Sequence, residues 1–244
     1  MAAEAARVSV CIGTYNGERF IDAQLESIFA QLGPRDNVVV SDDGSSDRTL
    51  EKIRRFAGPR LRLLQSPRLG ITGNFENALR HASGEYLFLA DQDDLWLEGK
   101  LAAMCEALAT HPLVVSDCTV VDAQGRVLHP SYFALLRSGP GILRNFVRNG
   151  YLGCCMAFRR ELLELVLPIP RAVPHDFWIG MLAELTDKPV FVPRPLLLYR
   201  RHAEMASFAG GRSGRPIPIR IAGRFILAMH LVLRVMRGRV PSEA

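Results

Sequence analysis

The alternation of apolar and helical segments over the first 95 residues is the feature that most constrains the fold. Each apolar segment is short, β-rich and followed by a loop containing Gly, Asn or Asp, which is typical of a buried strand. Strand–helix–strand alternation predicts parallel strands with helices on both faces of the sheet. We expect strands at Val8–Gly13, Val38–Ser41, Leu61–Gln65 and Tyr86–Ala90, separated by helices over 20–29, 50–56 and 75–82.

The polar loops that follow three of these strands are expected to share one crevice. In open parallel sheets, ligands bind beyond the carboxyl ends of the strands, where the connecting loops converge. The loops concerned are Thr14–Gly17, Asp42–Ser46 and Asp91–Asp94. We therefore expect the binding site of this half at that edge of the sheet.

The rest of the chain predicts further mixed elements and a separate tail. We see no clear linker before Ala209, so the expected division is a domain over 1–208 and a tail over 209–244. Expected helices cover 97–109, 160–167 and 176–185, and expected strands cover 113–121, 154–158, 189–192 and 196–199.

Charge and cysteine usage exclude some classes of protein. The net charge is +5, but seven arginines and one acid lie from Arg212 onward, so residues 1–211 are close to neutral. A nucleic-acid-binding main body would need basic stripes across its face. The five cysteines include no C-x-x-C pair typical of zinc sites, and buried reduced thiols fit the cytosol. The first ten residues lack the basic start and apolar stretch of a signal peptide.

The tail predicts a hinge and an amphipathic helix. Gly210–Pro216 has the composition of a hinge, and Ile219–Arg237 is apolar apart from one basic face. A charge-interrupted run is a poor membrane span, which favours an interfacial helix on the anionic inner face of the cell membrane. The alternative is a helix that packs its apolar face on the domain. The basic face consists of Arg220, Arg224, His230, Arg234 and Arg237.

The acidic run Asp91-Gln92-Asp93-Asp94 directly follows an apolar strand. Crowded carboxylates repel one another and raise their own pKa values unless a cation lies between them. Mg²⁺ or Mn²⁺ with oxygen ligands meets that need and stabilises the charge on a departing diphosphate. The alternative is a polar loop in which Asp94 caps the next helix.

A second acidic run, Ser41–Asp47, also follows a strand. Asp42 or Asp43 at that edge can accept hydrogen bonds from a nucleobase N–H or from ribose hydroxyls. The same letters form a good turn and helix-cap sequence, with Ser46 and Asp47 available as caps. Both readings remain open for this run.

Together these runs resemble the inverting family 2 glycosyltransferases with the GT-A fold. The matching motifs are Thr14-Tyr15-Asn16-Gly17, Ser41-Asp42-Asp43-Gly44-Ser45-Ser46-Asp47, Ala82-Ser83-Gly84-Glu85-Tyr86 and Asp91-Gln92-Asp93-Asp94, in the family's order and spacing. The resemblance extends from about residue 7 to about residue 205. It implies an α/β fold with a Rossmann-like, mostly parallel central sheet flanked by helices.

The resemblance also implies roles for individual residues. The loop of Thr14, Tyr15 and Asn16 would hold the base and ribose of a nucleotide-sugar donor together with Asp42, with Asp43 nearby. Asp91 would face the ribose or the metal, and Asp93 would be the main metal carboxylate. Asn74 could contact donor hydroxyls or only decorate a helix.

Two late segments complete the implied site. Pro174-His175-Asp176-Phe177-Trp178 resembles the segment that carries the family's general base, which makes Asp176 the expected base; its alternative role is a helix N-cap. In Tyr199-Arg200-Arg201-His202, Arg200 would lie near the phosphates and His202 would complete the metal or diphosphate site.

The expected function is transfer of a sugar from dTDP-rhamnose or a UDP-hexose to a glycan or lipid-linked hydroxyl in surface polysaccharide synthesis. Gln92 and Leu95-Trp96 resemble a subset that includes bacterial rhamnosyltransferases. A sugar nucleotidyltransferase would have a basic, Gly-rich phosphate loop after the first strand, which this chain lacks. A non-catalytic membrane adaptor would bind the donor without releasing nucleoside diphosphate.

Overall fold

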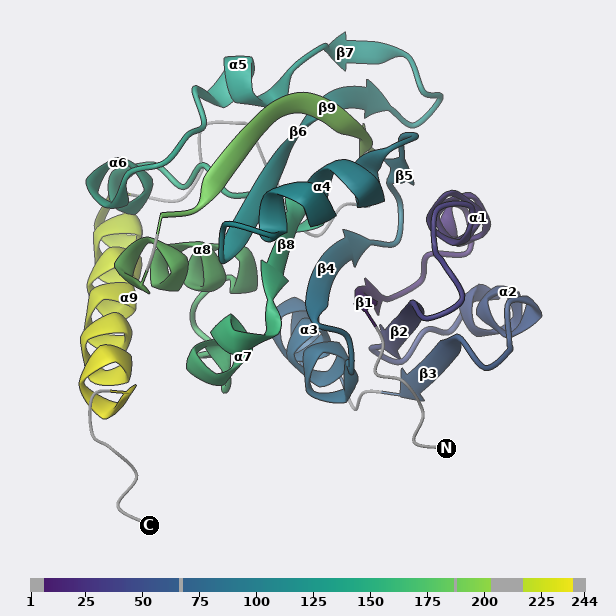
Figure 1. Ribbon diagram of the computed structural model, residues 1–244, viewed down its shortest axis with the longest axis horizontal. Coiled ribbons are helices and arrows are strands. Elements are labelled where there is room, and N and C mark those ends of the chain that lie inside the picture. The colour runs from purple at the N-terminus through teal and green to yellow at the C-terminus, as the bar shows by residue number, and fades with distance from the viewer. Residues whose placement is uncertain (1–6, 66–67, 187, 203–216, 239–244) are drawn as a thin grey trace.

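The computed structural model describes residues 7–65, 68–186, 188–202 and 217–238 (Figure 1). The hinge predicted at Gly210–Pro216 lies outside the described residues. Within the part of the chain that the structure describes, nine strands form one sheet in the order β3-β2-β1-β4-β8-β6-β9-β5, and β7 pairs with β6.

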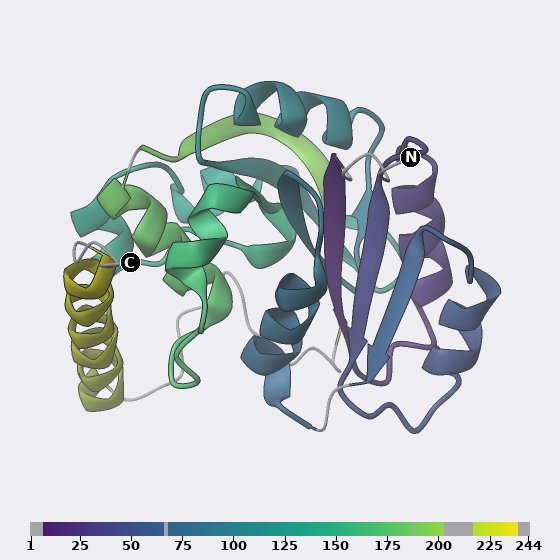
Figure 2. The same ribbon diagram turned by 60° about the horizontal axis from the view of Figure 1, so that its bottom comes forward.

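The first half is the predicted parallel α/β unit. Its four strands pair in parallel, and α3 lies on one side of them while α1 and α2 lie on the other (Figure 2). Because helices cover both faces, the strand interiors are almost continuously apolar. The strands are β1 (Val8–Thr14), β2 (Asn37–Asp42), β3 (Leu61–Gln65) and β4 (Tyr86–Asp91), and the helices are α1 (Ile21–Phe29), α2 (Thr49–Arg55) and α3 (Gly70–His81).

Beyond β4 the sheet becomes mixed. The strand β8 (Met156–Arg159) runs antiparallel to both β4 and β6, while β9 runs parallel to β6. The two extended pieces predicted at 189–192 and 196–199 form one long strand, β9 (Val190–Arg201), whose pairing with β6 shifts register around Asp117. Pro193 and Pro195 lack the N–H that a regular ladder requires, which explains why the sequence suggests a break. The other strands are β5 (Leu95–Trp96), β6 (Leu113–Asp122) and β7 (Val127–His129).

The helices expected over 160–167 and 176–185 are present within one residue of their predicted ends, whereas the helix expected over 97–109 is shorter. The helix expected over 97–109 begins only at Lys100, because Gly99 adopts a left-handed conformation (φ 81°) and Leu97 donates its N–H to Leu196. Four short elements, β5, α5, α6 and η1, were not predicted. The helical elements are α4 (Lys100–Leu108), α5 (Tyr132–Leu136), α6 (Ile142–Val147), the 3-10 turn η1 (Gly153–Cys155), α7 (Arg160–Val166), α8 (His175–Thr186) and α9 (Ile217–Gly238).

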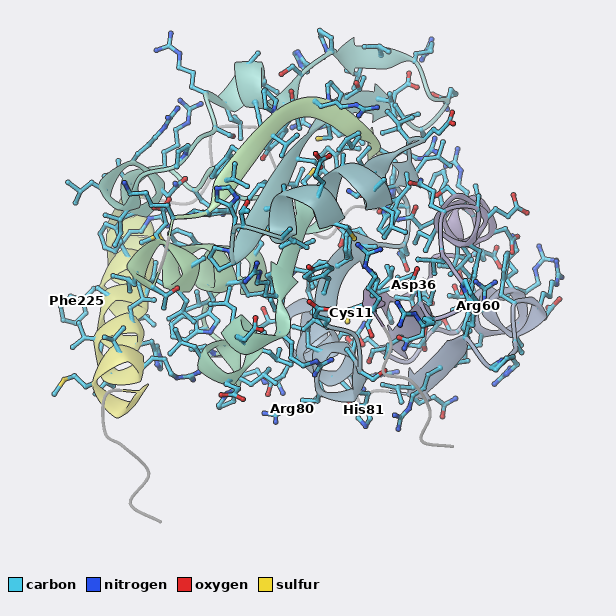
Figure 3. All side chains as sticks on the ribbon, viewed as in Figure 1. Cys11, Asp36, Arg60, Arg80, His81 and Phe225 are labelled. Atoms are coloured by element: carbon cyan, nitrogen blue, oxygen red, sulfur yellow. The ribbon has the colours of Figure 1, made fainter. Side chains whose placement is uncertain are left out.

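The last helix, α9, turns its basic side toward the domain. The guanidinium of Arg224 lies 4.2 Å from the ring centroid of Phe177, and that of Arg234 lies 5.2 Å from Trp178. The expected alternative, packing of the apolar face on the domain, is therefore wrong for most of that face: Leu227 is buried, but Phe225 projects outward (Figure 3). Among the described helices, none is long and apolar enough to cross a membrane.

Candidate functional site

The ends of β1, β2 and β4 bring the three predicted polar loops together. Thr14 is paired with Asp42 in the sheet register, and Gly13 is paired with Asp91. Because these strands are parallel, the loops leave the sheet at one edge. The predicted convergence of the donor loops and the acidic loop is confirmed as a spatial arrangement.

Asp42 organises the loop after β2. Its buried carboxylate accepts hydrogen bonds from Thr14 Oγ1 at 2.9 Å, the Gly44 N–H at 3.0 Å and the Ser45 N–H at 2.8 Å. The Ser45 hydroxyl donates a fourth, at 2.5 Å. Gly44 has φ 90°, a conformation that glycine adopts without a side-chain penalty. These contacts hold the loop in one shape before any ligand binds.

The loop after β1 is fastened on two sides. The Asn16 N–H donates to Ser45 Oγ at 2.9 Å, and Asn16 Oδ1 accepts from the Ser46 N–H at 2.9 Å. On the other side, Gln92 accepts from the Tyr15 N–H at 2.8 Å and donates to the Tyr15 carbonyl at 3.0 Å. The backbone of Tyr15 is thus fixed while its side chain is 54% exposed and able to meet a ligand.

Asp43 and Asn74 have different surroundings. The Asp43 carboxylate accepts from the N–H groups of Leu69 at 2.7 Å and Gly70 at 3.1 Å, so it stabilises the start of α3. Asn74 donates to the Thr14 carbonyl at 3.2 Å, and its buried Oδ1 has no hydrogen-bond partner among the described residues. Asn74 therefore presents an unused acceptor beside the end of β1, whereas Asp43 is occupied.

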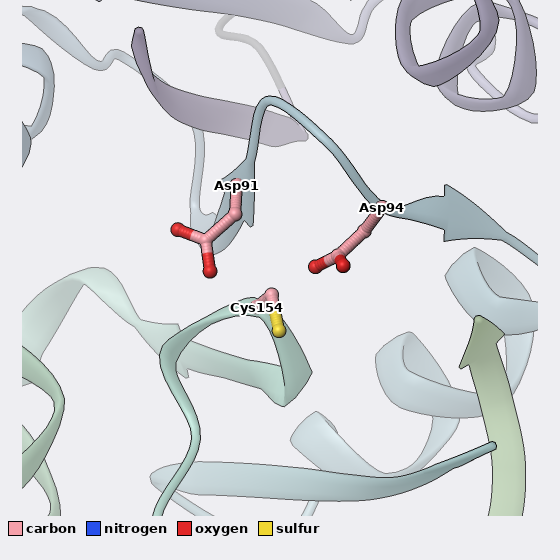
Figure 4. A group of neighbouring side chains, drawn as sticks. All are labelled: Asp91, Asp94 and Cys154. Atoms are coloured by element: carbon pink, nitrogen blue, oxygen red, sulfur yellow. The ribbon is translucent and has the colours of Figure 1, made fainter. Parts of the chain in front are cut away.

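Asp91 and Asp94 approach each other and Cys154 in the acidic loop. Their ligand atoms lie within 4.8 Å of one another (Figure 4). Burial, followed by repulsion from Asp93 and Asp176, raises the pKa of Asp91 to about 7. Burial, followed by repulsion from Asp93 and Asp91, also raises the pKa of Asp94 well above its usual range. The cluster concentrates negative charge in a place where water cannot disperse it.

Asp93 is turned toward the end of β9. Its Oδ2 lies 2.8 Å from His202 Nε2, and its carbonyl accepts from Arg200 Nε at 2.9 Å. The Arg200 N–H donates to Asp94 at 3.0 Å. The predicted metal residues are therefore divided: Asp93 pairs with His202, while Asp91 groups with Asp94 and Cys154. Asp94 belongs to the acidic run that the sequence singles out, but no sequence pattern predicts that Cys154 joins this group.

The acidic loop fits a hard divalent cation. Asp94 Oδ2 is buried and has no hydrogen-bond partner within the described ranges, so it has an unused lone pair. Carboxylate oxygens are the ligands that Mg²⁺ and Mn²⁺ favour, and a cation would relieve the repulsion among these acids. Cys154 suits such an ion less well, because burial raises the pKa of its thiol and keeps the proton on sulfur.

Asp176 lies in the first turn of α8. It is the second residue of the helix rather than the N-cap, since α8 begins at His175. Burial raises the pKa of its carboxyl to about 6. Its charge also acts on Asp91, which places the two carboxylates in one electrostatic environment.

The turn η1 joins Asp176 to the acidic loop. Cys154 contacts the Asp91 and Asp94 group, while a Cβ atom on Gly153 would lie 3.6 Å from the Asp176 Cβ. The same Cβ would lie only 2.9 Å from His175 Nε2. A glycine at this position therefore lets α8 begin directly against η1.

His175 is a further polar group of this site that sequence reasoning missed. Its ring stacks on Phe75 with centroids 4.1 Å apart, and its buried Nε2 has no hydrogen-bond partner among the described residues. Burial lowers the pKa of the imidazole to about 3, so the ring is neutral at physiological pH. Apart from the place of His175 beside Asp176, no sequence signal points to this role, because its stacking partner Phe75 lies a hundred positions earlier.

Comparison with known proteins explains this arrangement. The sequence model of the family described as Glycosyl transferase family 2 matches residues 9–167, about two thirds of the chain. The chain belongs to glycosyl transferase family 2. The match runs from β1 into the loop after α7, so it includes the acidic loop and ends before Asp176, Arg200 and His202.

A relative and two solved structures show what this glycosyltransferase is similar to. An Escherichia coli enzyme, UDP-Glc:alpha-D-GlcNAc-diphosphoundecaprenol beta-1,3-glucosyltransferase WfgD, is 36% identical over 95 residues, 38% of this chain and 38% of that protein. S. aureus TarS 1-349 in complex with UDP-GlcNAc has a TM-score of 0.70 at 20% identity, over 94% of this chain and 66% of that chain.

The second structure is mannosyltransferase PcManGT from Pyrobaculum calidifontis in complex with GDP-Man and Mn²⁺. Its TM-score is 0.64 at 26% identity, over 96% of this chain and 65% of that chain. The expected GT-A type fold is confirmed by these likenesses. The chain spans only 38% to 54% of the length of two of its curated relatives.

Proposed function

We propose that this glycosyltransferase moves a sugar from a nucleotide-diphosphate donor to a hydroxyl of a glycan or lipid-linked acceptor, with inversion at the anomeric carbon. The observation that carries the proposal is the junction at η1, where Gly153 lies beside Asp176 and Cys154 lies beside Asp91 and Asp94. Inverting transfer needs a base and a stabilised leaving group at one place.

The base and ribose of the donor are assigned to the fastened loops. Thr14, Tyr15, Asn16 and Asp42 form a preshaped wall there, and the Asn74 Oδ1 offers an acceptor to a ribose hydroxyl or a base N–H. A preshaped wall loses little conformational entropy when the donor binds. Asp43 contributes to donor binding only indirectly, because its carboxylate accepts hydrogen bonds from the N–H groups of Leu69 and Gly70 at the start of α3.

The cation, Mg²⁺ or Mn²⁺, is assigned to Asp91, Asp93 and Asp94, with His202 orienting Asp93. Bound there, it would neutralise the diphosphate leaving group. Arg200 is fixed beside this loop through the Asp93 carbonyl, which supports a place for its positive charge near the phosphates. PcManGT is described with Mn²⁺, which favours the same ion class here.

Asp176 is assigned as the general base that takes the proton of the acceptor hydroxyl as that oxygen attacks the sugar. A carboxyl with a pKa of about 6 is largely ionised at neutral pH and is a stronger base than an exposed aspartate.

The donor and acceptor are proposed more narrowly as dTDP-rhamnose or a UDP-hexose and a surface polysaccharide intermediate. The description of the Escherichia coli relative, with UDP-Glc and a diphosphoundecaprenol acceptor, supports the UDP-hexose and the lipid-linked acceptor. The likeness to rhamnosyltransferases depends on Gln92 and Leu95-Trp96. In the structure Gln92 holds the backbone of Tyr15 and Trp96 is buried, so these two residues have structural roles that do not depend on the sugar. We therefore place the UDP-hexose first.

We further propose that residues 1–208 form the catalytic domain and that the tail over 209–244 holds it at the inner face of the cell membrane. A lipid-linked acceptor would be reached from that position.

A donor screen tests the proposed function. The purified chain would be incubated with dTDP-rhamnose and UDP-hexoses, with Mn²⁺ and a lipid-linked acceptor, and released UDP or dTDP would be measured. We expect acceptor-stimulated release that Asp176→Asn loses and Glu106→Gln, an exposed acid on α4, keeps. Donor binding without release from any donor would indicate the non-catalytic adaptor instead.

A further inference from the structure

The outward face of α9 is an exposed apolar stripe. Phe225 is 73% exposed, Val232 is 58% exposed and Met236 is 63% exposed. Positions three and four apart lie on one side of a helix, so these side chains and their neighbours form a continuous row. Such a row usually packs on the domain, and its exposure here requires a reason. The stripe consists of Phe225, Met229, Val232, Leu233 and Met236.

The stripe faces outward because specific contacts fix the opposite side of α9. Arg234 donates hydrogen bonds to the carbonyls of Leu165 at 2.5 Å, Leu167 at 2.9 Å and Pro168 at 2.6 Å. Arg224 donates to the Val147 carbonyl at 3.4 Å while it lies over Phe177. Turning α9 over would break these charge-assisted bonds, which are stronger than neutral ones.

Two more exposed apolar residues lie on α6, next to α9. Leu143 is 79% exposed and Val147 is 72% exposed, and the Val147 carbonyl is the group that Arg224 reaches. Figures 1 and 2 both show α6 at one end of α9, on the side of the molecule opposite α1 and α2. We call Leu143, Val147 and the five stripe residues the α6–α9 apolar surface.

The sequence around this surface carries only positive charge. Residues 123–160 contain six arginines and no acid, and residues 205–242 contain seven arginines and no acid. Arg137, Arg144 and Arg148, which flank α6, are exposed. The acid in contact with α6, Glu184, is half-buried and already accepts hydrogen bonds from the Gly141 N–H and from Asn145 Nδ2. An apolar surface bordered mainly by arginines is complementary to a bilayer with anionic headgroups, because acyl chains accept the apolar groups and phosphates accept the guanidinium groups.

We propose that the α6–α9 apolar surface inserts into an anionic lipid bilayer, with Leu143, Val147, Phe225 and the rest of the stripe in the acyl region. The basic side of α9, which the sequence assigns to lipid, instead attaches the helix to the domain. This proposal deepens the membrane association that forms part of the proposed function.

Membrane insertion at this surface affects the site through α8. Phe177 and Trp178, on which the arginines of α9 lie, directly follow the proposed base Asp176 in the chain. A bilayer that holds α9 therefore also holds α8, which carries the proposed base in its first turn. A lipid-linked acceptor would meet the enzyme on that side of the molecule.

Vesicle co-sedimentation of the full chain tests the proposal. We expect binding to phosphatidylcholine vesicles that contain phosphatidylglycerol, and roughly tenfold or greater loss of binding in Phe225→Glu/Val232→Glu. Leu143→Glu/Val147→Glu on α6 is expected to show a loss of the same kind. The matched control, Val127→Glu/Leu128→Glu, introduces the same charge at two exposed apolar residues of β7 and is expected to bind as the unaltered chain does.

Three results would overturn the proposal: no binding of the unaltered chain, equal loss in the β7 control, or undiminished binding in both surface variants. Light scattering provides one further test. If the unaltered chain is a dimer, and the α9 substitutions convert it to a monomer without changing vesicle binding, the surface is an interface between two copies of the chain and the proposal is wrong. Circular dichroism and donor-dependent release of nucleoside diphosphate in solution are measured on every variant. Vesicle binding without release of nucleoside diphosphate would contradict the proposed function and support the membrane surface. Release of nucleoside diphosphate without vesicle binding would support the proposed function and contradict the membrane surface.

Discussion

Two regions of the site are built in opposite ways: the proposed donor side, formed by the loops after β1 and β2, and the proposed reaction side, formed by the acidic loop and Asp176. On the donor side, Asp42 accepts four hydrogen bonds and the loop of Tyr15 and Asn16 is fastened from two directions. On the reaction side, burial raises the pKa values of Asp91 and Asp176, and Asp94 keeps an oxygen without a partner among the described residues.

This difference shows which part of the site is complete without ligands. Carboxylates that already accept several hydrogen bonds fix geometry and change little when a donor arrives. Carboxylates that are buried beside one another are destabilised in the ionised state. Binding of a cation, or transfer of a proton from the acceptor, reduces the repulsion between their charges. The donor side is therefore a scaffold, and the reaction side is where ligand binding and pH have their largest effects.

The largest effect is expected from Asp176→Asn. Loss of a general base lowers turnover by roughly 10²–10⁴-fold, and donor affinity is expected to stay unchanged because the donor side is separate. In the unaltered enzyme, turnover should rise with pH through about 6 as Asp176 becomes ionised, and the variant should lack that rise. Steady-state rates over a pH series check both points. Undiminished turnover in the variant would remove Asp176 as the base.

The next effect is expected from Asp91→Asn, in metal-dependent turnover and in stability. A lost cation ligand should reduce turnover by roughly 10²-fold. The folded-state pKa of Asp91 is raised to about 7, so its contribution to stability is present below the unfolded pKa of about 4 and is lost as pH rises toward 7.

Thermal unfolding in the absence of metal measures that contribution. The unaltered protein should lose stability across this pH window more steeply than Asp91→Asn, and Mn²⁺ at pH 7 should restore it only in the unaltered protein. Identical pH dependence in the two proteins would show that Asp91 is not buried beside other charges.

A smaller effect on activity is expected from Asp42→Ala. This substitution tests the difference between the two regions, because Asp42 belongs to the hydrogen-bonded loops of the donor side. Without the Asp42 carboxylate, the Thr14 hydroxyl and the N–H groups of Gly44 and Ser45 lose their acceptor. This loss is expected to lower the free energy of unfolding by about 1–3 kcal/mol. Donor affinity should fall while the pH profile of turnover keeps its shape. Denaturant unfolding and donor titration measure these outcomes, and an altered pH profile would contradict the separation of the two sides.

The smallest change is expected from Gln92→Ala. This residue links the acidic loop to the Tyr15 backbone through two hydrogen bonds, each worth about 1 kcal/mol. Donor affinity should weaken several-fold while the affinity for Mn²⁺ alone is retained. If the affinity for Mn²⁺ falls as much as the affinity for the donor, Gln92 supports the cation site and the prediction is wrong.

The sequence predicts the donor side better than the reaction side for a physical reason. Val8–Gly13 and Val38–Ser41 are mostly apolar runs that end close to where the strands end, so the local pattern places Thr14 and Asp42 within one residue of the strand–loop boundary. The reaction side joins segments far apart in the chain: Asp94 meets the backbone of Arg200, and Gly153 meets Asp176. No local period encodes η1 or the grouping of Cys154 with two acids, so those contacts emerge only in the folded chain.

The tail shows the same limit. Helical spacing in the sequence predicts the helix and its basic face, and α9 has both. Which face meets the domain depends on the carbonyl groups at Leu165–Pro168 and on the ring of Phe177, which no property of the tail itself reveals.

Calorimetric titration of UDP and dTDP, with and without Mn²⁺ and in buffers of different ionisation enthalpy, tests whether the acidic cluster holds a cation for the diphosphate. We expect Mn²⁺ to strengthen nucleotide binding roughly tenfold or more and protons to be released near pH 6.5, because a group with a pKa of about 7 must ionise to bind the ion. Equal nucleotide affinity with and without Mn²⁺, and no proton release, would contradict it.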